Sequence, residues 1–319
     1  MGDTKDSVAC PKNVSDNPNA GMDNSDIVAR LLREMDPDSK KALQGWYWFD
    51  WANQAFALTV ITVVVPTLLS NMFNLANGGS ADYAGMTFTG DSFYAVVLGV
   101  SSVFVAIVSP ILGAIADRMP IKKRILKIYT IVGILFTGLM GLAPHMDDGS
   151  SYKFLAICLI MGNIGFAGGH AIYSAFLPYL GDKRLMDHIS SWGYAYGFLG
   201  GSSLLTMHLI VGLKLGFNDP FVQSFVFVTS ALWWLGFSFP IFRHTPEPEI
   251  PNPTEYASFG EAVIDGIREI RNTFSEIRRY RILTLFMIGY LLFYDGINAI
   301  GGLAAAYADS VLRIDISMN

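Results

Sequence analysis

The stretch WYWFDWANQAFALTVITVVVPTLLSNMF, residues 46–73, decides the fold class of this chain. It is apolar along almost its whole length, and its only charged residue is Asp50. At a rise of 1.5 Å per residue, about 20 helical residues cross a hydrocarbon core about 30 Å thick. A helix that is apolar on every face belongs in a core or a membrane. The stretch therefore predicts a membrane-spanning helix.

Six more blocks of this kind follow along the chain. Hydrophobic residues make up 52% of the sequence and charged residues only 15%, which is lean for a soluble domain. We therefore expect an all-α membrane protein with seven spans, at Trp46–Phe73, Phe93–Ile115, Ile125–Ala143, Phe154–Leu180, Ile189–Leu213, Phe221–Phe242 and Ile282–Ala308.

The basic residues predict the orientation. They gather before the first span and in every second loop after it, whereas the loops between hold only Lys153 and Lys214. By the positive-inside rule, the N-terminus and the basic loops are cytosolic. This orientation argues against a G-protein-coupled receptor, whose N-terminus lies outside. The basic residues on the cytosolic side are Arg30, Arg33, Lys40, Lys41, Arg118, Lys122, Lys123, Arg124, Lys127, Lys183, Arg184, Arg243, Arg268, Arg271, Arg278, Arg279 and Arg281.

Four regions are expected along the chain. Residues 1–45 form a polar, largely disordered cytosolic tail with one short amphipathic helix near its end. Residues 46–243 form a six-span half, and residues 244–281 a cytosolic linker that is first proline-rich and then an amphipathic helix. Residues 282–319 hold the first span of a second half, whose remainder is missing. We expect the seventh helix to pack poorly and this chain alone not to transport.

Six spans, a long linker and a further span are the layout of a major facilitator transporter. The loop after the second span contains Gly113, Asp117 and Arg118, similar to the Gly-x-x-x-Asp-Arg signature of that superfamily. As a cytosolic gate, the glycine would allow close helix approach, and the Asp would cap a helix or pair with an Arg. Met119-Pro120-Ile121 departs from the signature. The alternative is an ordinary basic loop.

Several segments in order resemble the vacuole effluxer-like (autophagy-related protein 22-like) family. They are Phe49–Phe56, Ser109–Arg118, Ala175–Pro178, Ser191–Gly201 and Tyr294–Gly296. The resemblance implies a major facilitator fold and, for fungal members, export of amino acids from the vacuole lumen during autophagy. It implies the vacuolar membrane in a eukaryote and the plasma membrane otherwise.

The candidate site is a repeated aromatic-Asp-x-x-Asn pattern. Asp50 and Asn53 in the first span recur as Asp295 and Asn298 in the seventh, which are the corresponding first helices of the two halves. A spacing of three places each Asp and Asn on one helix face. Because an ionised carboxylate inside a membrane is costly, each Asp should face a watery central cavity. It would bind a substrate ammonium group or carry the coupling proton. Alternatively, Asp50 only holds the helix end at the interface.

His170 in the fourth span is a further candidate for a proton relay or a carboxylate ligand. A packed histidine bonded to a neighbouring helix is the alternative. Glycines at steps of three or four in the fourth and fifth spans predict close helix packing. They are Gly162, Gly165, Gly168, Gly169, Gly193, Gly197 and Gly201.

The function expected is secondary active transport of amino acids or similar small solutes, with a coupling proton and membrane lipid as the other partners. No enzyme motif, cofactor, metal cluster or nucleic-acid role is expected. Cys10 and Cys158 lie in contexts too different to form a disulfide. A membrane sensor built on a transporter fold, without transport, is the alternative function.

Overall fold

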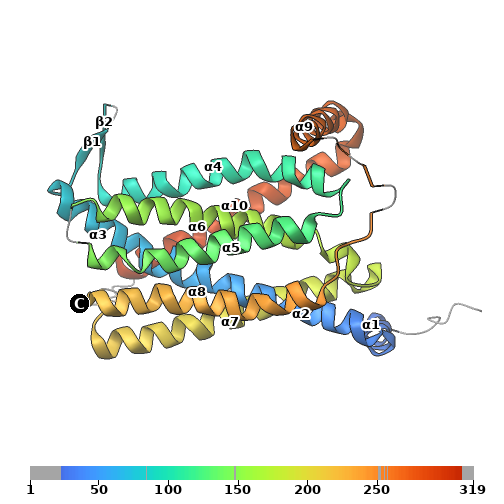
Figure 1. Cartoon of the computed structure of the whole chain (residues 1–319), viewed down its shortest axis with the longest axis horizontal. Coiled ribbons are helices and arrows are strands. Elements are labelled where there is room, and N and C mark those ends of the chain that lie inside the picture. The colour runs from blue at the N-terminus through green and yellow to red at the C-terminus, as the bar shows by residue number, and fades with distance from the viewer. Residues whose placement is uncertain are drawn as a thin grey trace, which may run out of the picture.

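A bundle of long helices makes up most of the molecule (Figure 1). The computed structural model describes residues 23–83, 85–146, 149–250, 253–254, 256 and 258–310. Within these ranges, six helices are long and apolar enough to cross a membrane. The expected all-α membrane fold is confirmed. The six are Pro37–Asn77, Gly90–Ala116, Lys122–His145, Ser151–Tyr179, Lys183–Leu215 and Pro220–His244.

The first of these segments comprises α2 (Pro37–Ala55), η1 (Phe56–Val64) and α3 (Val65–Asn77). The others contain α4 (Gly90–Ala116), α5 (Lys122–Met140), α6 (Ser151–Ser174), α7 (Met186–Leu215) and α8 (Pro220–His244). Two short helices lie across one end of the bundle, α1 (Asn24–Glu34) and α9 (Phe259–Glu276) (Figure 1). The basic loop between α4 and α5 is also there, and we call this the basic end. The opposite end carries the antiparallel hairpin of β1 (Ala81–Tyr83) and β2 (Met86–Phe88).

The first long helix begins earlier than its hydropathy suggests. Asp36 caps α2 by accepting hydrogen bonds from the backbone N–H groups of Asp38 and Ser39, and Pro37 fits the first turn. Residues 37–45 are therefore already helical before the expected membrane entry at residue 46. The short amphipathic helix expected before it is confirmed as α1. Residues 1–22 lie outside the described ranges.

A π-helical segment, η1, interrupts the α-helical pattern in the middle of the first span. Its hydrogen bonds reach five residues back, as from the N–H of Val65 to the carbonyl of Val60. Pro66 has no N–H, so it cannot donate the corresponding hydrogen bond to the carbonyl of Ile61. The hydroxyl of Tyr94 on α4 donates to that carbonyl at 2.7 Å instead. A side chain of the second span thus completes the backbone bonding of the first.

The hydrogen bond from Tyr94 to the Ile61 carbonyl can be tested by substitution. Tyr94→Phe leaves the Ile61 carbonyl without its donor, which should destabilise the bundle by about 1–3 kcal/mol. Pro66→Ala restores an N–H that can bond this carbonyl, so adding it should shrink the loss caused by Tyr94→Phe. Thermal unfolding of the four proteins in detergent measures this coupling. Equal losses with and without Pro66 would show that the hydroxyl serves another purpose.

The expected glycine contacts are present at both helix pairs. Along α7, Gly193 lies against the ring of Trp46, Gly197 against the Asp50 carboxylate and Gly201 against the backbone of Gln54. On α6, Gly165 lies against the backbone of Gly133 on α5. A Cβ at any of these positions would come within 3.0 Å of a neighbouring atom. The glycines therefore let α7 and α5 approach α2 and α6 closely.

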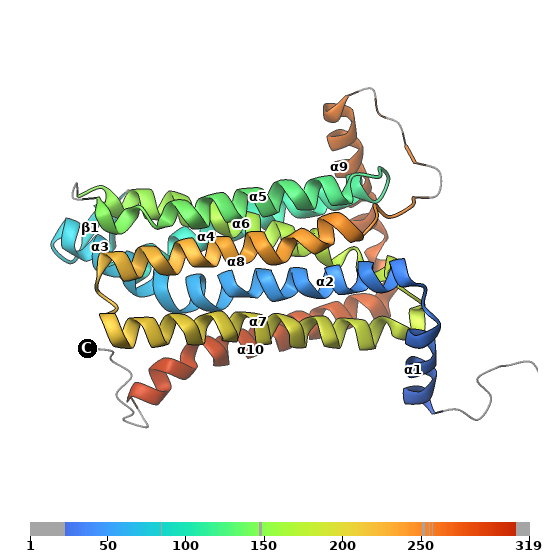
Figure 2. The same cartoon turned by 60° about the horizontal axis from the view of Figure 1, so that its bottom comes forward.

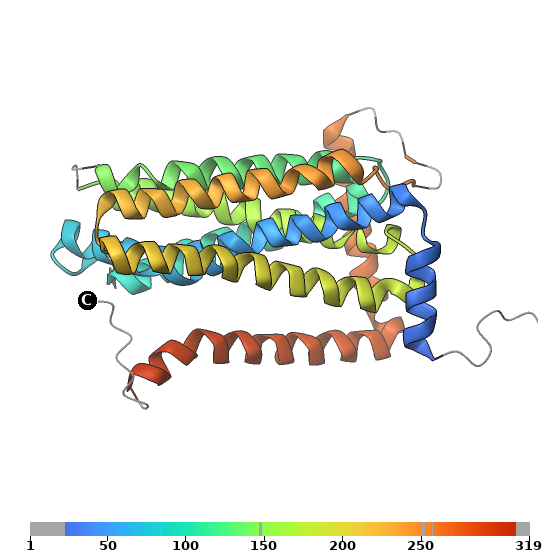
Figure 3. The same ribbon diagram turned by 90° about the horizontal axis from the view of Figure 1, so that it is seen from below.

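The expected seventh span is a helix, α10 (Arg281–Ser310), which lies to one side of the bundle (Figure 3). The large apolar side chains from Ile282 to Tyr294 are 50–87% exposed. This part of α10 therefore contributes little to the core, as expected for a poorly packed helix.

Candidate functional site

Asp50 lies inside the bundle on α2, whose neighbours α7 and α8 are visible in Figure 2. It is about 20 Å along the helix from Pro37, counted at 1.5 Å per residue. Its side chain is 2% exposed. A Cβ added at Gly197 of α7 would lie 2.7 Å from its Oδ2, so the carboxylate packs directly against this glycine. Gln54, one turn further along α2, is a neighbour that can donate to the carboxylate.

Most polar side-chain atoms of Asp50 and Asn53 have no partner in the described part of the chain. Asp50 Oδ1 and both side-chain polar atoms of Asn53 have no hydrogen-bond partner among the described residues. Asn53 is fully buried. Buried polar groups in native proteins almost always have partners, and a buried carboxylate without one is expensive. Burying Asp50 and Asn53 in this way is therefore costly to the fold. This cost favours a functional role for Asp50 over the alternative that it only holds the helix end.

Tyr173 on α6 extends this set of polar groups. Its hydroxyl is buried without a hydrogen-bond partner in the part of the chain described, and it lies close enough to Asp50 to interact electrostatically. Its ring packs on Phe49 with centroids 5.1 Å apart. Tyr173 is not among the site residues that the sequence predicted. Its spacing of three from His170, which places both on one helix face, is the signal that points to it.

His170 lies one turn before Tyr173 on α6, and their ring centroids are 5.5 Å apart. Its Nδ1 is buried, and within the described ranges it has no hydrogen-bond partner. The structure thus places Tyr173 of α6 against Phe49 of α2 and near Asp50, with His170 beside Tyr173 on α6 and Asn53 one turn after Asp50 on α2. We call Asp50, Asn53, Tyr173 and His170 the polar cluster. Asp295 and Asn298 lie in α10, but their side chains fall outside the described part of the structure.

The expected cytosolic gate centres on Arg118. Its guanidinium forms ion pairs with Asp265 at 2.5 Å and Glu269 at 2.7 Å, both on α9. Tyr256 donates to the same Asp265 oxygen at 2.8 Å. We call these four residues the Arg118 ion-pair cluster. It holds the linker helix against the end of α4, where Gly266 of α9 packs on the backbone of Ile111.

The other two gate residues lie differently than expected. Asp117 pairs with Lys122 at 2.8 Å rather than with an arginine, and it does not cap α5. A Cβ at Gly113 would meet no atom within 4 Å among the described residues. The close approach expected at Gly113 is therefore absent there and occurs at Gly266 instead. The physical reason is that α9 docks through its small residues, which sequence periodicity alone does not reveal.

Removing the Arg118 guanidinium should release α9. Two partly exposed ion pairs contribute about 0.5–1 kcal/mol each, so Arg118→Gln should speed amide exchange in α9 by about fivefold or more. Arg268→Gln is the matched control, because Arg268 is 68% exposed and reaches Asp265 only at 3.4 Å. Hydrogen exchange followed by mass spectrometry compares them. Equal exchange in both variants would contradict a holding role for Arg118.

The same cluster sets a pH dependence for α9. The hydrogen bond from Tyr256, with the charges of Arg118 and Arg268, lowers the pKa of Asp265 below its usual 3.8. A lowered pKa means that this stabilisation is complete above pH 3.8 and is lost as the pH falls through the lowered value. Docking of α9 should therefore survive mild acid, and Tyr256→Phe should move its loss to higher pH.

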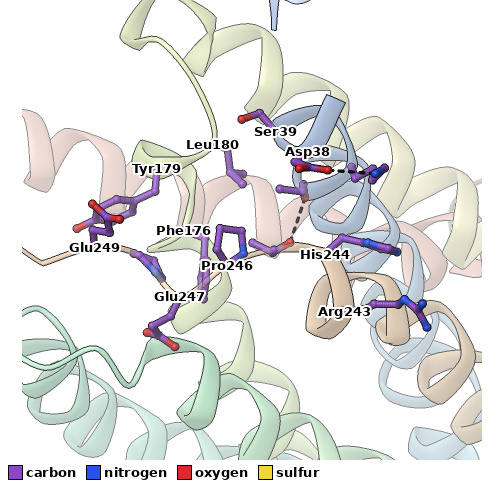
Figure 4. Close-up of a pocket in the computed structure, with 14 residues that line it drawn as sticks. Asp38, Ser39, Phe176, Tyr179, Leu180, Arg243, His244, Pro246, Glu247 and Glu249 are labelled. Atoms are coloured by element: carbon purple, nitrogen blue, oxygen red, sulfur yellow. Dashed lines mark hydrogen bonds and ion pairs between the residues drawn. The ribbon is translucent and has the colours of Figure 1, made fainter. Parts of the chain in front are cut away.

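The start of the linker is fixed by separate contacts. Thr245 donates its hydroxyl to the carbonyl of Ala42, and Lys123 donates to the Thr245 carbonyl and to Glu247. These bonds border a cavity of about 640 Å³ between the start of α2, the turn after α6 and the linker (Figure 4). Its lining mixes basic residues with Asp38, Glu247 and Glu249, so it favours no single class of ligand.

Comparison with known proteins decides the family. The chain matches the family described as "Vacuole effluxer Atg22 like" over residues 38–318. It belongs to this family. The match begins one residue after the start of α2 and runs through the polar cluster, the Arg118 ion-pair cluster and α10. The family resemblance seen in the sequence is confirmed.

Two relatives show how this Atg22-like chain compares with longer proteins. An uncharacterized MFS-type transporter of Bacillus subtilis is 23% identical, covering 85% of this chain and 61% of the relative. An autophagy-related protein 22 of Kluyveromyces lactis is 22% identical, covering 87% of this chain and 63% of the relative. The chain thus spans less than two thirds of either relative's length. No solved structure matches it.

Proposed function

We propose that this Atg22-like chain is part of a secondary active transporter for amino acids or similar small solutes. The observation that carries the proposal is Asp50, a nearly fully buried carboxylate with one oxygen that no described residue bonds. The protein must gain something for keeping it in a membrane interior. Binding a substrate ammonium group or a coupling proton would neutralise the carboxylate.

The residues of the polar cluster divide the work in this proposal. Asp50 carries the proton or the ammonium group. Asn53 and Tyr173 bear polar groups that can hydrogen-bond a substrate carboxylate or a water molecule. His170 sits one turn from Tyr173 and is the candidate relay toward the outside of the cluster. In the seventh helix, Asp295 and Asn298 supply the corresponding pair from the other half of the transporter.

Because Asp50 is closed off here, access requires a movement. The π-helical segment η1 begins three residues after Asn53 and departs from the α-helical bonding pattern. Such segments often lie at functional sites. We place the hinge of the movement there, with the Arg118 ion-pair cluster as the cytosolic gate that holds one arrangement of the linker.

The test is a transport screen. The protein as its organism makes it is reconstituted in liposomes and offered labelled amino acids, with and without an imposed pH gradient. Uptake of at least one amino acid, increased by the gradient, is the expected result. Saturable binding without uptake of any solute would instead favour the membrane sensor.

The orientation is a separate proposal with its own test. A cysteine at Ser258 before α9 should react with an impermeant reagent only from the cytosolic side, and one at Thr87 in the hairpin only from the other side. Both positions are exposed. Cys10 is first replaced, and Cys158 is buried. Labelling of Ser258→Cys in intact cells would reverse the proposed topology.

A further inference from the structure

A groove lies between α4 and α5 at the basic end. Both helices pack on α6, and the groove between them is closed on a third side by α9. Its volume is about 740 Å³. Its walls are mainly apolar and include Phe104 and Leu112 of α4, Ile125 and Ile128 of α5 and Ala262 of α9, with Arg124 at the mouth.

Arg124 differs from Arg118, Lys122 and Lys123 in having no partner for its side chain among the described residues. The Arg118 side chain pairs with Asp265 and Glu269, and that of Lys122 pairs with Asp117. The Lys123 side chain donates to the Thr245 carbonyl. Neither Arg124 nor Lys127 has an ion pair or hydrogen bond from its side chain to any described residue. Both side chains are exposed, and none of the described residues that line the groove bears a carboxylate. Among the described residues, the mouth therefore carries positive charge that no lining carboxylate balances.

Beyond Arg124 and Lys127, the same face of α5 becomes apolar. Ile128, Ile131 and Leu135 follow at steps of four, three and four, and each is more than half exposed. Across the groove, Phe104 of α4 is 47% exposed. In a membrane-spanning bundle, this face meets acyl chains, while Arg124 stands at the level of the headgroups. The charge and the apolar surface thus match the two ends of one amphiphile.

We propose that this groove binds one anionic phospholipid. Its phosphate pairs with Arg124, Lys127 adds a second positive charge, and an acyl chain lies along Ile128 toward Leu135. Basic pockets between membrane helices are suited to anionic headgroups. The hydroxyl of Ser258, which lines the mouth and caps α9, is placed to donate to the phosphate. Because α9 forms one wall, the bound lipid bridges the helix bundle and the linker.

The test uses the purified chain in detergent with added phosphatidylglycerol or phosphatidylcholine, and native mass spectrometry counts the retained lipid. The chain should keep phosphatidylglycerol in preference to phosphatidylcholine. Arg124→Gln should lower this retention about fivefold, which corresponds to about 1 kcal/mol for one cation near an anionic lipid. Lys183→Gln removes a charge from the same end, away from the groove, and should change nothing.

Two further variants keep the test decisive. Arg124→Lys retains the charge and should retain most of the lipid. Ser258→Asp preserves a good helix cap but places a negative charge at the mouth, so it should release phosphatidylglycerol even with Arg124 intact. Equal retention of the two lipids, or full retention by Arg124→Gln, overturns the proposal. Displacement of phosphatidylglycerol by millimolar inorganic phosphate also overturns it, because that result indicates a site for soluble anions.

Discussion

Asp50→Asn should abolish the dependence of solute uptake on a pH gradient, or sharply weaken substrate binding. The two outcomes distinguish the two roles open to Asp50. If it carries the proton, uptake loses its response to the gradient while the KM changes little. If it binds an ammonium group, losing one partner of a buried charge pair costs about 2–5 kcal/mol, so the KM rises about 30-fold or more.

The control is Asp187→Asn, which removes an exposed carboxylate from the first turn of α7. It should transport like the unaltered protein. Asp50→Glu keeps the carboxylate beside Gly197 and should retain part of the activity. Membrane insertion and monodispersity of each variant are checked before transport. If Asp50→Asn keeps both the native KM and the native pH dependence, the polar cluster is not the site.

Gly165→Ala should be the most destabilising small substitution in the bundle. A Cβ at this position would lie 2.4 Å from the backbone nitrogen and 2.5 Å from the Cα of Gly133. Backbone atoms cannot rotate away as a side chain can, so α5 and α6 must separate. Such overpacking costs about 1–3 kcal/mol or more. Thermal unfolding in detergent measures the loss.

Gly236→Ala on α8 is the matched control, because a Cβ there meets no described atom within 4 Å. It makes the same chemical change in another membrane helix and should be neutral or slightly stabilising. If the two variants unfold at the same temperature, the contact between α5 and α6 is looser than the structure indicates.

The sequence predicted those parts of the fold that depend on local pattern. Each of three such features is a property of a single helix. They are the length of the apolar stretch 46–73, the glycine spacing on α6 and α7, and the apolar periodicity of α9. The membrane thickness or the close approach of a neighbour constrains that helix directly. These features were therefore accessible before the structure. Asp36-Pro37 was also a readable start signal, but hydropathy alone placed the boundary later.

The features that sequence could not supply depend on contacts between distant elements. The π-helical segment is completed by Tyr94, a residue of another helix, although Pro66 marks the place. Arg118 finds its partners on α9, well over a hundred residues later, and no pattern near Asp117 indicates this. For the polar cluster, the sequence identified Asp50, Asn53 and His170 by type. Their burial and the nearby Tyr173 emerged only from the packing of α2 on α6 and α7.

The most direct measurement of the central claim is proton movement on substrate addition. Liposomes holding the protein as its organism makes it, with no imposed gradient, are given an amino acid found to be transported. A pH-sensitive dye then records the external pH. The account predicts a substrate-dependent pH change with the unaltered protein and Asp187→Asn, and none with Asp50→Asn. An undiminished pH change with Asp50→Asn would contradict it.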